Sequence, residues 1–283
     1  MNLHNIGVIG AGTMGNGIAQ ICAVAGINVT LLDISAGALE KALATVSKNL
    51  DRQVSKGILS EPQKHTALGN IHTSTDYASL ANAQWVIEAA TENLELKRRV
   101  LQQIAANVSE QCVIASNTSS LSITELAAGV NAPERFIGLH FFNPVPVMGL
   151  IEVIRGLQTS DTTHAQAIEL AQYLGKTAIT AGNRPGFVVN RILVPMINEA
   201  ILVLQEGLAS AEDIDAGMSL GCNQPIGPLA LADLIGLDTL LAILEAFYEG
   251  FQDSKYRSAP LLREMVAAGY LGRKTGRGFH TYG

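Results

Sequence analysis

Short apolar runs alternate with amphipathic stretches along the chain as far as residue 180. The apolar runs have the pattern of strands at residues 6–9, 28–32, 85–89, 113–116, 136–140 and 151–155. Between several of them lie helical patterns such as ALEKALATVSKNLDRQV and LELKRRVLQQIAANV. Strands and helices that alternate in this way predict an α/β fold, in which helices cover both faces of a mostly parallel, doubly wound sheet.

The pattern changes at NRPGFVVNR, where Pro185 and Gly186 interrupt it. From Val188 onward nearly every stretch has a helical pattern, including VVNRILVPMINEAILVLQEG and LDTLLAILEAFYEGF. We therefore predict two domains: residues 1–184, which hold the sheet, and residues 185–283, an all-α C-terminal domain. Ser210 followed by Asp213 predicts the start of a helix in the second domain.

The helix expected at residues 190–204 is apolar on more than one face. It contains Pro195, which should kink or break it. A helix that is apolar all round is buried, either in the core of one subunit or against a second copy of the chain. Both interpretations remain open, and we expect a homodimer formed through this C-terminal domain.

The composition limits the possible partners. Of 283 residues, 48% are hydrophobic and 16% charged, so the chain can build a substantial core. The net charge of −6 argues against a general affinity for nucleic acid, and any anion site must be a local basic cluster. No uncharged apolar run reaches the ~18 residues of a membrane span, and the opening MNLHNIGVIGAG has the pattern of a strand rather than a signal peptide. We expect a cytoplasmic protein without nucleic acid or membrane partners.

The three cysteines, Cys22, Cys112 and Cys222, are far apart in the sequence. Their odd number and spacing match neither a disulfide framework nor a metal site, and we expect no metal. We interpret them as free thiols of a reducing compartment, with packing as the default role of each.

The sequence GAGTMG matches the G-x-G-x-x-G pattern in the right context: it follows the strand NIGVI and opens a helical stretch. In a Rossmann-type fold these glycines permit a tight turn, the approach of a pyrophosphate and close packing of the helix on the strand. The helix N-terminus favours the phosphates. Asp33 ends the next strand, where a carboxylate binds ribose hydroxyls and repels a 2′-phosphate, so we expect NAD rather than NADP. The candidate cofactor-binding residues are Gly10, Ala11, Gly12, Thr13, Met14, Gly15 and Asp33.

His140 and Glu152 stand out in the apolar segment GLHFFNPVPVMGLIEVIR. Imidazole changes its charge near neutral pH, which suits a general acid or base. A carboxylate in an Ile/Val run is costly to bury unless it is paired. If the NPVPV segment folds the chain back, Glu152 reaches a ring nitrogen of His140, fixes its tautomer and stabilises the imidazolium. The two residues then explain each other as a catalytic pair.

Longer motifs resemble those of the L-3-hydroxyacyl-CoA dehydrogenases, most closely the bacterial enzymes for 3-hydroxybutyryl-CoA. They are GAGTMG, VIEAATEN, SNTSSLSIT, GLHFFNPVPVM, PGFVVNR and LGRKTGRGF, and they span essentially the whole chain. HFFNP and PGFVVNR are far more specific than the glycine loop. The resemblance implies an NAD-dependent enzyme that interconverts (3S)-3-hydroxyacyl-CoA and 3-oxoacyl-CoA. We expect no fused hydratase, because the two predicted domains leave no part of the sequence to form one.

The resemblance also implies roles for single residues. His140 and Glu152 correspond to the catalytic dyad, and Ser119 and Asn190 to residues that contact the substrate. The further candidate cofactor contacts are Glu92, Lys97, Asn117, Ser119, Asn143 and Lys274. Simpler interpretations remain: helix caps for Ser119 and Asn190, a turn for Asn143, a solvated helix start for Glu92 and Lys97, and an exposed basic tail for Lys274.

Coenzyme A carries phosphates that an acidic protein must meet with a local basic cluster. In SKNLDRQVSKG, Lys48, Arg52 and Lys56 recur at intervals of four and would line one face of a helix. We expect this face, which includes Asn49, to bind the phosphates of CoA, and the resemblance supports Lys56. A solvated helix face, with Asp51 among the basic residues, is the simpler alternative.

Two other functions are compatible with the sequence. A related dehydrogenase would act on a free hydroxy acid or sugar acid, and a comparison of acyl-CoA with free-acid substrates separates it from the first interpretation. A catalytically silent nucleotide-binding protein would keep the fold without the chemistry. The pairing of His140 with Glu152 argues against the silent protein.

Overall fold

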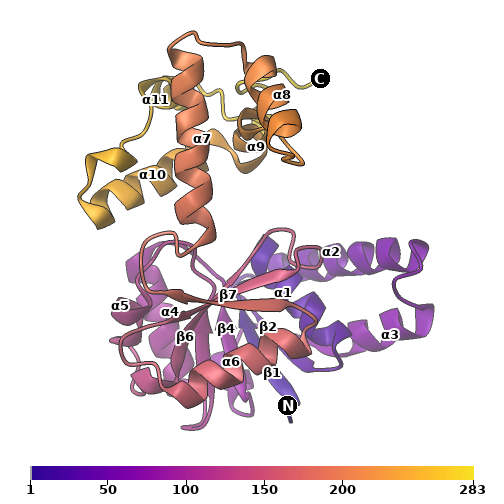
Figure 1. Cartoon of the computed structure of the whole chain (residues 1–283). Helices are drawn as coiled ribbons and strands as arrows, with labels where there is room; N and C mark the ends of the chain where they lie inside the picture. The colour runs from indigo at the N-terminus through magenta and orange to yellow at the C-terminus, as the bar shows by residue number, and fades with distance from the viewer. Residues whose placement is uncertain (1) are drawn as a thin grey trace. The chain divides into compact units, whose positions relative to one another are not determined.

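The computed structural model describes residues 2–283, and the chain forms two compact units that divide between Arg184 and Pro185. The first unit holds a mostly parallel sheet with helices, and the second is built from helices (Figure 1). The predicted fold class, a doubly wound α/β unit followed by an all-α unit, is confirmed.

An eight-stranded sheet forms the centre of the first unit, with the strand order β3-β2-β1-β4-β5-β6-β7-β8. Strands β1 to β6 are mutually parallel, β7 is antiparallel to β6, and β8 is parallel to β7. The carboxyl ends of β1 to β6 therefore meet at one edge, which is where ligands bind in sheets of this order. The strands are β1 (Asn5–Ile9), β2 (Asn28–Leu32), β3 (Ile71–Ser74), β4 (Trp85–Glu88), β5 (Val113–Ser116), β6 (Phe136–Phe141), β7 (Leu150–Arg155) and β8 (Thr177–Gly182).

The sequence pattern missed β3 and β8, the two strands at the ends of the sheet. His72 and Thr73 of β3 are exposed, and of the six residues of β8 only Ala181 is buried. A strand at the edge has a neighbour on one side only and is less covered, so its sequence does not show the continuous apolar run of a central parallel strand.

Helices α1, α2, α3 and α6 share one hydrophobic core with the sheet, in which Val8 and Leu31 of the strands pack with Ile18 of α1 and Val46 of α2. Helices α4 and α5 contact β4 and β6, respectively. The helices are α1 (Thr13–Val24), α2 (Ala36–Ser55), α3 (Glu61–Gly69), α4 (Leu94–Asn107), α5 (Ile123–Ala127) and α6 (Asp161–Tyr173), with 3₁₀ turns η1 (Tyr77–Leu80) and η2 (Pro133–Arg135).

The second unit consists of α7 (Val189–Gln205), α8 (Ala211–Gly221), α9 (Pro228–Ile235), α10 (Leu237–Phe251) and α11 (Pro260–Ala267), with 3₁₀ turns η3 (Ser254–Tyr256) and η4 (Arg273–Thr275). As predicted, Ser210 caps α8, and its hydroxyl accepts from the Asp213 amide at 3.1 Å. The break expected at Pro195 is wrong, because α7 continues through it. Val194 and Ile197 of this helix are buried in the core of the unit, and that packing offsets the amide that proline lacks.

Two of the three cysteines serve as core residues. Cys22 and Cys112 are buried, and burial raises the pKa of each thiol to about 12. Cys222 is exposed, so packing does not account for it. All three are free thiols. Among residues 2–283, no helix has both the length and the apolar character needed to cross a membrane.

Candidate active site

The glycine loop between β1 and α1 has the backbone that phosphate binding requires. Gly10 has a φ of +98°, and a Cβ at Gly15 would lie 1.7 Å from the Gly10 carbonyl oxygen, so neither position accepts a side chain. A Cβ at Gly12 would meet nothing within 4 Å, which leaves the space over the loop open. Gly12 caps α1 without a side-chain hydrogen bond, so the first amides of this helix have no side-chain cap. The loop fits the pyrophosphate of a dinucleotide.

Asp33 follows β2 and reaches back to the same loop. Its Oδ2 accepts a hydrogen bond from the Ala11 amide at 2.8 Å, and its Oδ1 accepts from the Ser35 amide at 2.9 Å. Thr13 and Met14 form the start of α1 beside this contact. The carboxylate is only partly buried, so the same edge of the sheet carries a fixed negative charge next to the phosphate loop.

His140 and Glu152 face each other directly across the antiparallel strands β6 and β7. The distance from His140 Nδ1 to Glu152 Oε2 is 2.7 Å, and the side chains are 8% and 0% exposed. The ring of Phe142 lies 4.5 Å from the imidazole, measured between centroids. The structure thus brings together the two residues that the sequence predicted to pair. Their direct contact fixes which ring nitrogen faces the acid and which faces the other way.

Asn117 and Asn143 follow the neighbouring strands β5 and β6. The Asn117 carboxamide oxygen accepts from the Phe141 amide at 2.9 Å, so Asn117 joins the end of β5 to the residue after His140. Asn143 is exposed in the turn that follows β6. The interpretation of Asn143 as a turn residue therefore holds for its position, and its contact with a cofactor remains a prediction.

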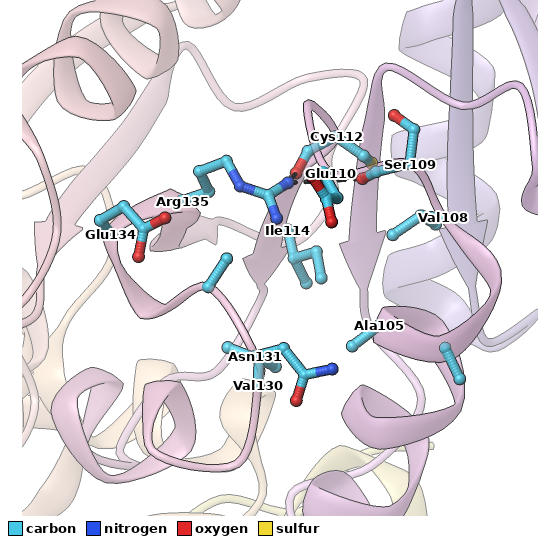
Figure 2. Close-up of a pocket in the computed structure, with 12 residues that line it drawn as sticks. Ala105, Val108, Ser109, Glu110, Cys112, Ile114, Val130, Asn131, Glu134 and Arg135 are labelled. Atoms are coloured by element: carbon cyan, nitrogen blue, oxygen red, sulfur yellow. Dashed lines mark hydrogen bonds between the residues drawn. The ribbon is translucent and has the colours of Figure 1, made fainter.

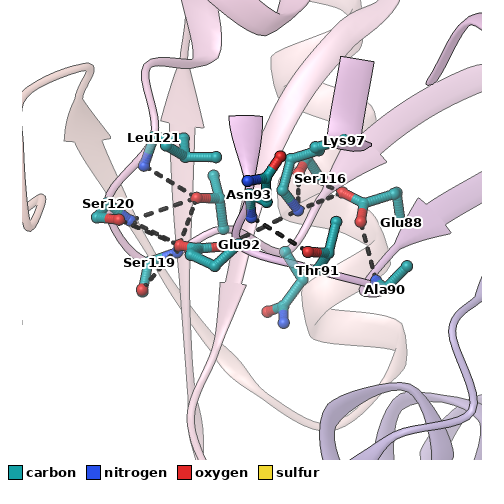
Figure 3. Close-up of polar contacts among 12 residues, drawn as sticks. Glu88, Ala90, Thr91, Glu92, Asn93, Lys97, Ser116, Ser119, Ser120 and Leu121 are labelled. Carbon is teal, nitrogen blue, oxygen red and sulfur yellow. Dashed lines mark hydrogen bonds and ion pairs between the residues drawn. The ribbon is translucent and has the colours of Figure 1, made fainter. Parts of the chain in front are cut away.

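A second group of polar side chains lies at the carboxyl ends of β4 and β5 (Figure 3). Lys97 of α4 is fully buried, and its ammonium lies 2.5 Å from Glu88 Oε2 and 3.2 Å from Ser116 Oγ. The interpretation of Lys97 as part of a solvated helix start is wrong, because its side chain is buried and contacts Glu88. Sequence analysis missed Glu88 and Ser116. The available signal was an acid at the end of the buried strand WVIE.

Glu92 organises the loop that contains Ser119. Its Oε1 accepts from the Ser119 amide at 2.7 Å, from the Ser119 hydroxyl at 2.9 Å and from the Thr118 hydroxyl at 2.8 Å. The N-cap of the following helix α5 is Ser122. Ser119 is therefore not the helix cap that its Ser/Thr-rich surroundings favour.

Asn190 and Lys274 belong to the second unit. Helix α7 begins at Val189 and its N-cap is Val188, so Asn190 lies in the first turn and does not cap the helix. The Lys274 ammonium lies 2.5 and 2.6 Å from the two carboxylate oxygens of Asp238, and this contact lowers the pKa of Asp238. Lys274 is thus held by an acid of its own unit and is not a loose basic tail.

The basic cluster of α2 is exposed. Lys48 and Arg52 lie within the helix, and Lys56 is its C-cap residue. Asp51, which supported the interpretation as a solvated face, pairs instead with Lys64 of α3 at 2.5 Å. Asn49 donates to Gln20 of α1 at 3.3 Å and so faces the neighbouring helix. Asp51 is therefore paired with Lys64 rather than with the three basic side chains of the cluster.

A cavity of about 540 Å³ lies at the edge of the sheet opposite the glycine loop (Figure 2). It is lined by residues at the amino ends of β5 and β6, among them Cys112 and Arg135. The Arg135 guanidinium donates to the Cys112 carbonyl oxygen at 2.5 Å. None of the predicted site residues lines this cavity, which is outside the candidate active site. Residues 2–283 also contain no group of three or more His, Cys, Asp or Glu side chains that could hold a metal ion.

Two family models and several known proteins match the chain over nearly its whole length. A family model described as 3-hydroxyacyl-CoA dehydrogenase, NAD binding domain, matches residues 5–184, and the model of the C-terminal domain matches residues 186–282. A 3-hydroxybutyryl-CoA dehydrogenase of Bradyrhizobium diazoefficiens is 51% identical over 280 residues, which cover 99% of this chain and 96% of the relative. The crystal structure of (S)-3-hydroxybutyryl-CoA dehydrogenase from Ralstonia eutropha is 62% identical, covers 100% of both chains and has a TM-score of 0.97. The chain therefore belongs to the 3-hydroxyacyl-CoA dehydrogenase family, and its first unit is the NAD-binding domain of that family.

Proposed function

We propose that the protein is an NAD-dependent dehydrogenase that interconverts (3S)-3-hydroxybutyryl-CoA and acetoacetyl-CoA. The observation that carries the proposal is the 2.7 Å contact between His140 and the buried carboxylate of Glu152. The pair lies on β6 and β7 of the sheet in which β1 leads into the glycine loop. Strand β6 is parallel to β1, so His140 near its carboxyl end lies at the same edge of the sheet as that loop. A relative from Bacillus subtilis, named probable 3-hydroxybutyryl-CoA dehydrogenase, is 49% identical over 282 residues, 100% of this chain and 98% of the relative.

His140 is the proposed general base. It takes the proton of the 3-hydroxyl group through Nε2, because Nδ1 faces Glu152. Glu152 is fully buried and stabilises the imidazolium that this step forms. Bound NAD, held by the glycine loop and Asp33, would supply the acceptor for the hydride of C3. In the reverse reaction the imidazolium returns its proton to the 3-oxo oxygen.

The cofactor would lie along the carboxyl ends of the strands. The loop at residues 10–15 would hold its pyrophosphate, and Asp33 the adenosine ribose. We propose the remaining contacts from the family resemblance. They are Glu92, Lys97, Asn117, Ser119, Asn143 and Lys274.

From the family resemblance we also propose Ser119 and Asn190 as residues that contact the substrate. For the phosphates of CoA we propose the basic cluster of α2, with Lys48, Asn49, Arg52 and Lys56 as its members. Lys48, Arg52 and Lys56 are exposed, as a binding face for a large anion must be.

We also propose a cytoplasmic homodimer. In the second unit, α7 and α8 line an apolar hollow of about 430 Å³ with Met196, Val203, Ile214 and Met218. Ile192 on α7 is 67% exposed. Apolar surface of this kind is typical of a subunit interface. The free cysteines support a reducing compartment.

The test is a substrate comparison in which NADH oxidation is followed at 340 nm. We expect acetoacetyl-CoA to be reduced with a kcat/KM roughly a hundredfold or more above that for free acetoacetate, since binding of the CoA part contributes to transition-state stabilisation. Equal rates with the two substrates would indicate a dehydrogenase of free acids. No turnover of either would indicate a silent NAD-binding protein.

A further inference from the structure

Glu88, Ser116 and Lys97 form a buried polar group beside the loop of Ser119. Glu88 ends β4 and Ser116 ends β5, where they are direct neighbours in the register of the two parallel strands. All three side chains are fully buried. The Ser116 hydroxyl donates to Glu88 Oε2 at 2.8 Å, the oxygen that also faces the Lys97 ammonium. Glu88 Oε1 accepts from the Ala90 amide at 2.9 Å, so both carboxylate oxygens have partners.

Stability alone does not account for such a pair. A buried ion pair loses much of its attraction to the cost of removing both charges from water, and apolar residues of similar size are often equally stable there. A lysine that is 0% exposed is rare unless it is paired. Its position next to the loop at residues 118–120 suggests that its charge serves that loop.

The Lys97 ammonium has a second acidic neighbour, Glu92. Glu92 Oε2 lies 3.9 Å from the Lys97 nitrogen, while Glu92 Oε1 accepts the hydrogen bonds of Thr118 and Ser119 (Figure 3). The Glu92 side chain is 42% exposed. Hydroxyls and amides of residues 118–120 hold its Oε1, whereas Lys97 is the charged neighbour of its Oε2. Lys97 therefore lies between a buried acid that anchors it and a half-exposed acid that it attracts.

The hydrogen bond between Ser119 and Glu92 has a fixed direction. A carboxylate only accepts, so the Ser119 hydroxyl must donate its single proton to Glu92 Oε1 at 2.9 Å. The two lone pairs of this hydroxyl are then directed away from Glu92. The backbone amide of Ser119 also donates to the same oxygen at 2.7 Å, which fixes the residue as well as its hydroxyl group.

We propose that the Glu88–Lys97 pair is a positioning device for catalysis: it holds the Glu92 carboxylate in place, and Glu92 in turn orients the Ser119 hydroxyl toward the reacting groups. This inference rests on the proposed function, in which Ser119 contacts the substrate. Glu88, Lys97 and Ser116 act through Glu92 and Ser119 and do not themselves touch the substrate.

The test uses Glu88→Gln/Lys97→Met, which removes both buried charges together and leaves no unpaired one. We expect a melting temperature within a few degrees of the parent, because the neutral pair keeps the volume. We expect kcat with acetoacetyl-CoA and NADH to fall at least about tenfold, since small misplacements of a site group have effects of this size. If Lys97 only neutralises Glu88, the double variant keeps the kcat of the parent, and the proposal is wrong.

A combination with Ser119→Ala tests the route of the effect. If the buried pair acts through Ser119, adding the double substitution to Ser119→Ala lowers kcat no further than Ser119→Ala does alone. Losses that multiply would show that the pair acts elsewhere and would overturn the proposal. Should the double variant not fold, Glu92→Gln, which changes a half-exposed residue, replaces it in the same cycle with the same two outcomes.

The matched control is Glu245→Gln/Arg263→Met, which removes an exposed ion pair of the second unit with an oxygen–nitrogen distance of 2.9 Å. We expect this variant to keep the kcat of the parent. Turnover of acetoacetyl-CoA by the parent and the control tests the proposed function separately from the positioning device. If the parent is inactive, the proposed function fails. If the parent is active and the double variant equals it, only the positioning device fails.

Discussion

Two buried carboxylates lie in the same sheet, and each contacts a nitrogen-bearing side chain. Glu152 contacts the His140 ring at 2.7 Å, and Glu88 contacts the Lys97 ammonium at 2.5 Å. Both carboxylates are 0% exposed. The pairs differ in their partner, because an imidazole gains and loses a proton near neutral pH whereas an ammonium normally keeps its charge.

That difference separates chemistry from positioning. The His140 ring can take up and return a proton during a catalytic cycle while Nδ1 stays hydrogen-bonded to Glu152. The Lys97 ammonium keeps its proton, so this pair does not exchange protons and can only position the groups around it. Breaking the first pair should therefore lower the rate, and breaking the second should first lower the stability.

The largest effect is expected for Glu88→Gln alone. It leaves the Lys97 ammonium buried without its carboxylate, and loss of one partner of a buried pair destabilises a protein by about 3–5 kcal/mol. Thermal unfolding followed by circular dichroism should show a lower melting temperature for this variant. The control is Glu245→Gln, which breaks an exposed pair and should change the stability by less than about 1 kcal/mol. Equal melting temperatures of the two variants would contradict the assigned role of the buried charge.

Glu152→Gln should lower kcat on the order of 10²-fold, because an amide cannot stabilise the imidazolium of His140. The stability should fall less than in Glu88→Gln, since a neutral imidazole can remain beside the amide. Steady-state kinetics and thermal unfolding of the same preparation measure both quantities. A variant that keeps the kcat of the parent would reduce Glu152 to a structural residue.

The His140–Glu152 pair was predictable because each residue interrupts an apolar strand, and the Pro-containing turn between them implies a hairpin. Glu88 likewise places a charged residue in an apolar strand, at the end of WVIE. The sequence around its partner Lys97 gives no such signal. Lys97 lies in LELKRRV, where neighbouring charged residues give the pattern of a solvated helix. Only the packing of α4 against the sheet shows that this one lysine points inward, and a local pattern does not contain that packing.

The fold was predictable where burial is greatest. The central strands have apolar runs because both of their faces are covered, whereas β3 and β8 at the edges lack such runs and were missed. Pro195 shows the reverse case. A local rule predicted a kink or a break at this proline, and the helix does not break there. Val194 and Ile197, on either side of the proline, are buried.

Asp33 provides a third carboxylate for the comparison, one that is partly exposed and bound only to backbone amides in its known contacts. Asp33→Asn keeps an acceptor oxygen and removes the charge that repels a 2′-phosphate. We expect the ratio of kcat/KM for NADPH to that for NADH to rise by about tenfold or more, since like-charge contacts cost several kcal/mol. An unchanged ratio, or a parent that already uses NADPH well, would contradict the proposed site of the adenosine ribose.

The smallest effect is expected at the surface of α2, where the charges are exposed and screened. Arg52→Gln/Lys56→Gln should raise KM for acetoacetyl-CoA by a few fold at low salt and less at high salt, with kcat and KM for NADH unchanged. Lys41→Gln, on the same helix but outside the cluster, is the control and should leave KM unaltered. If the double variant has the KM of the parent at low salt, the phosphates of CoA bind elsewhere.

The most direct test of the central claim is the rate of a single turnover in His140→Ala. Stopped-flow absorbance at 340 nm, with saturating NADH and acetoacetyl-CoA, reports hydride transfer without the release of products. We predict a rate lower by at least about 10²-fold than in the parent, as expected for loss of a general acid. Binding of NADH, measured by its fluorescence, should be unchanged. A rate close to that of the parent would contradict the assignment of His140 as the group that transfers the proton.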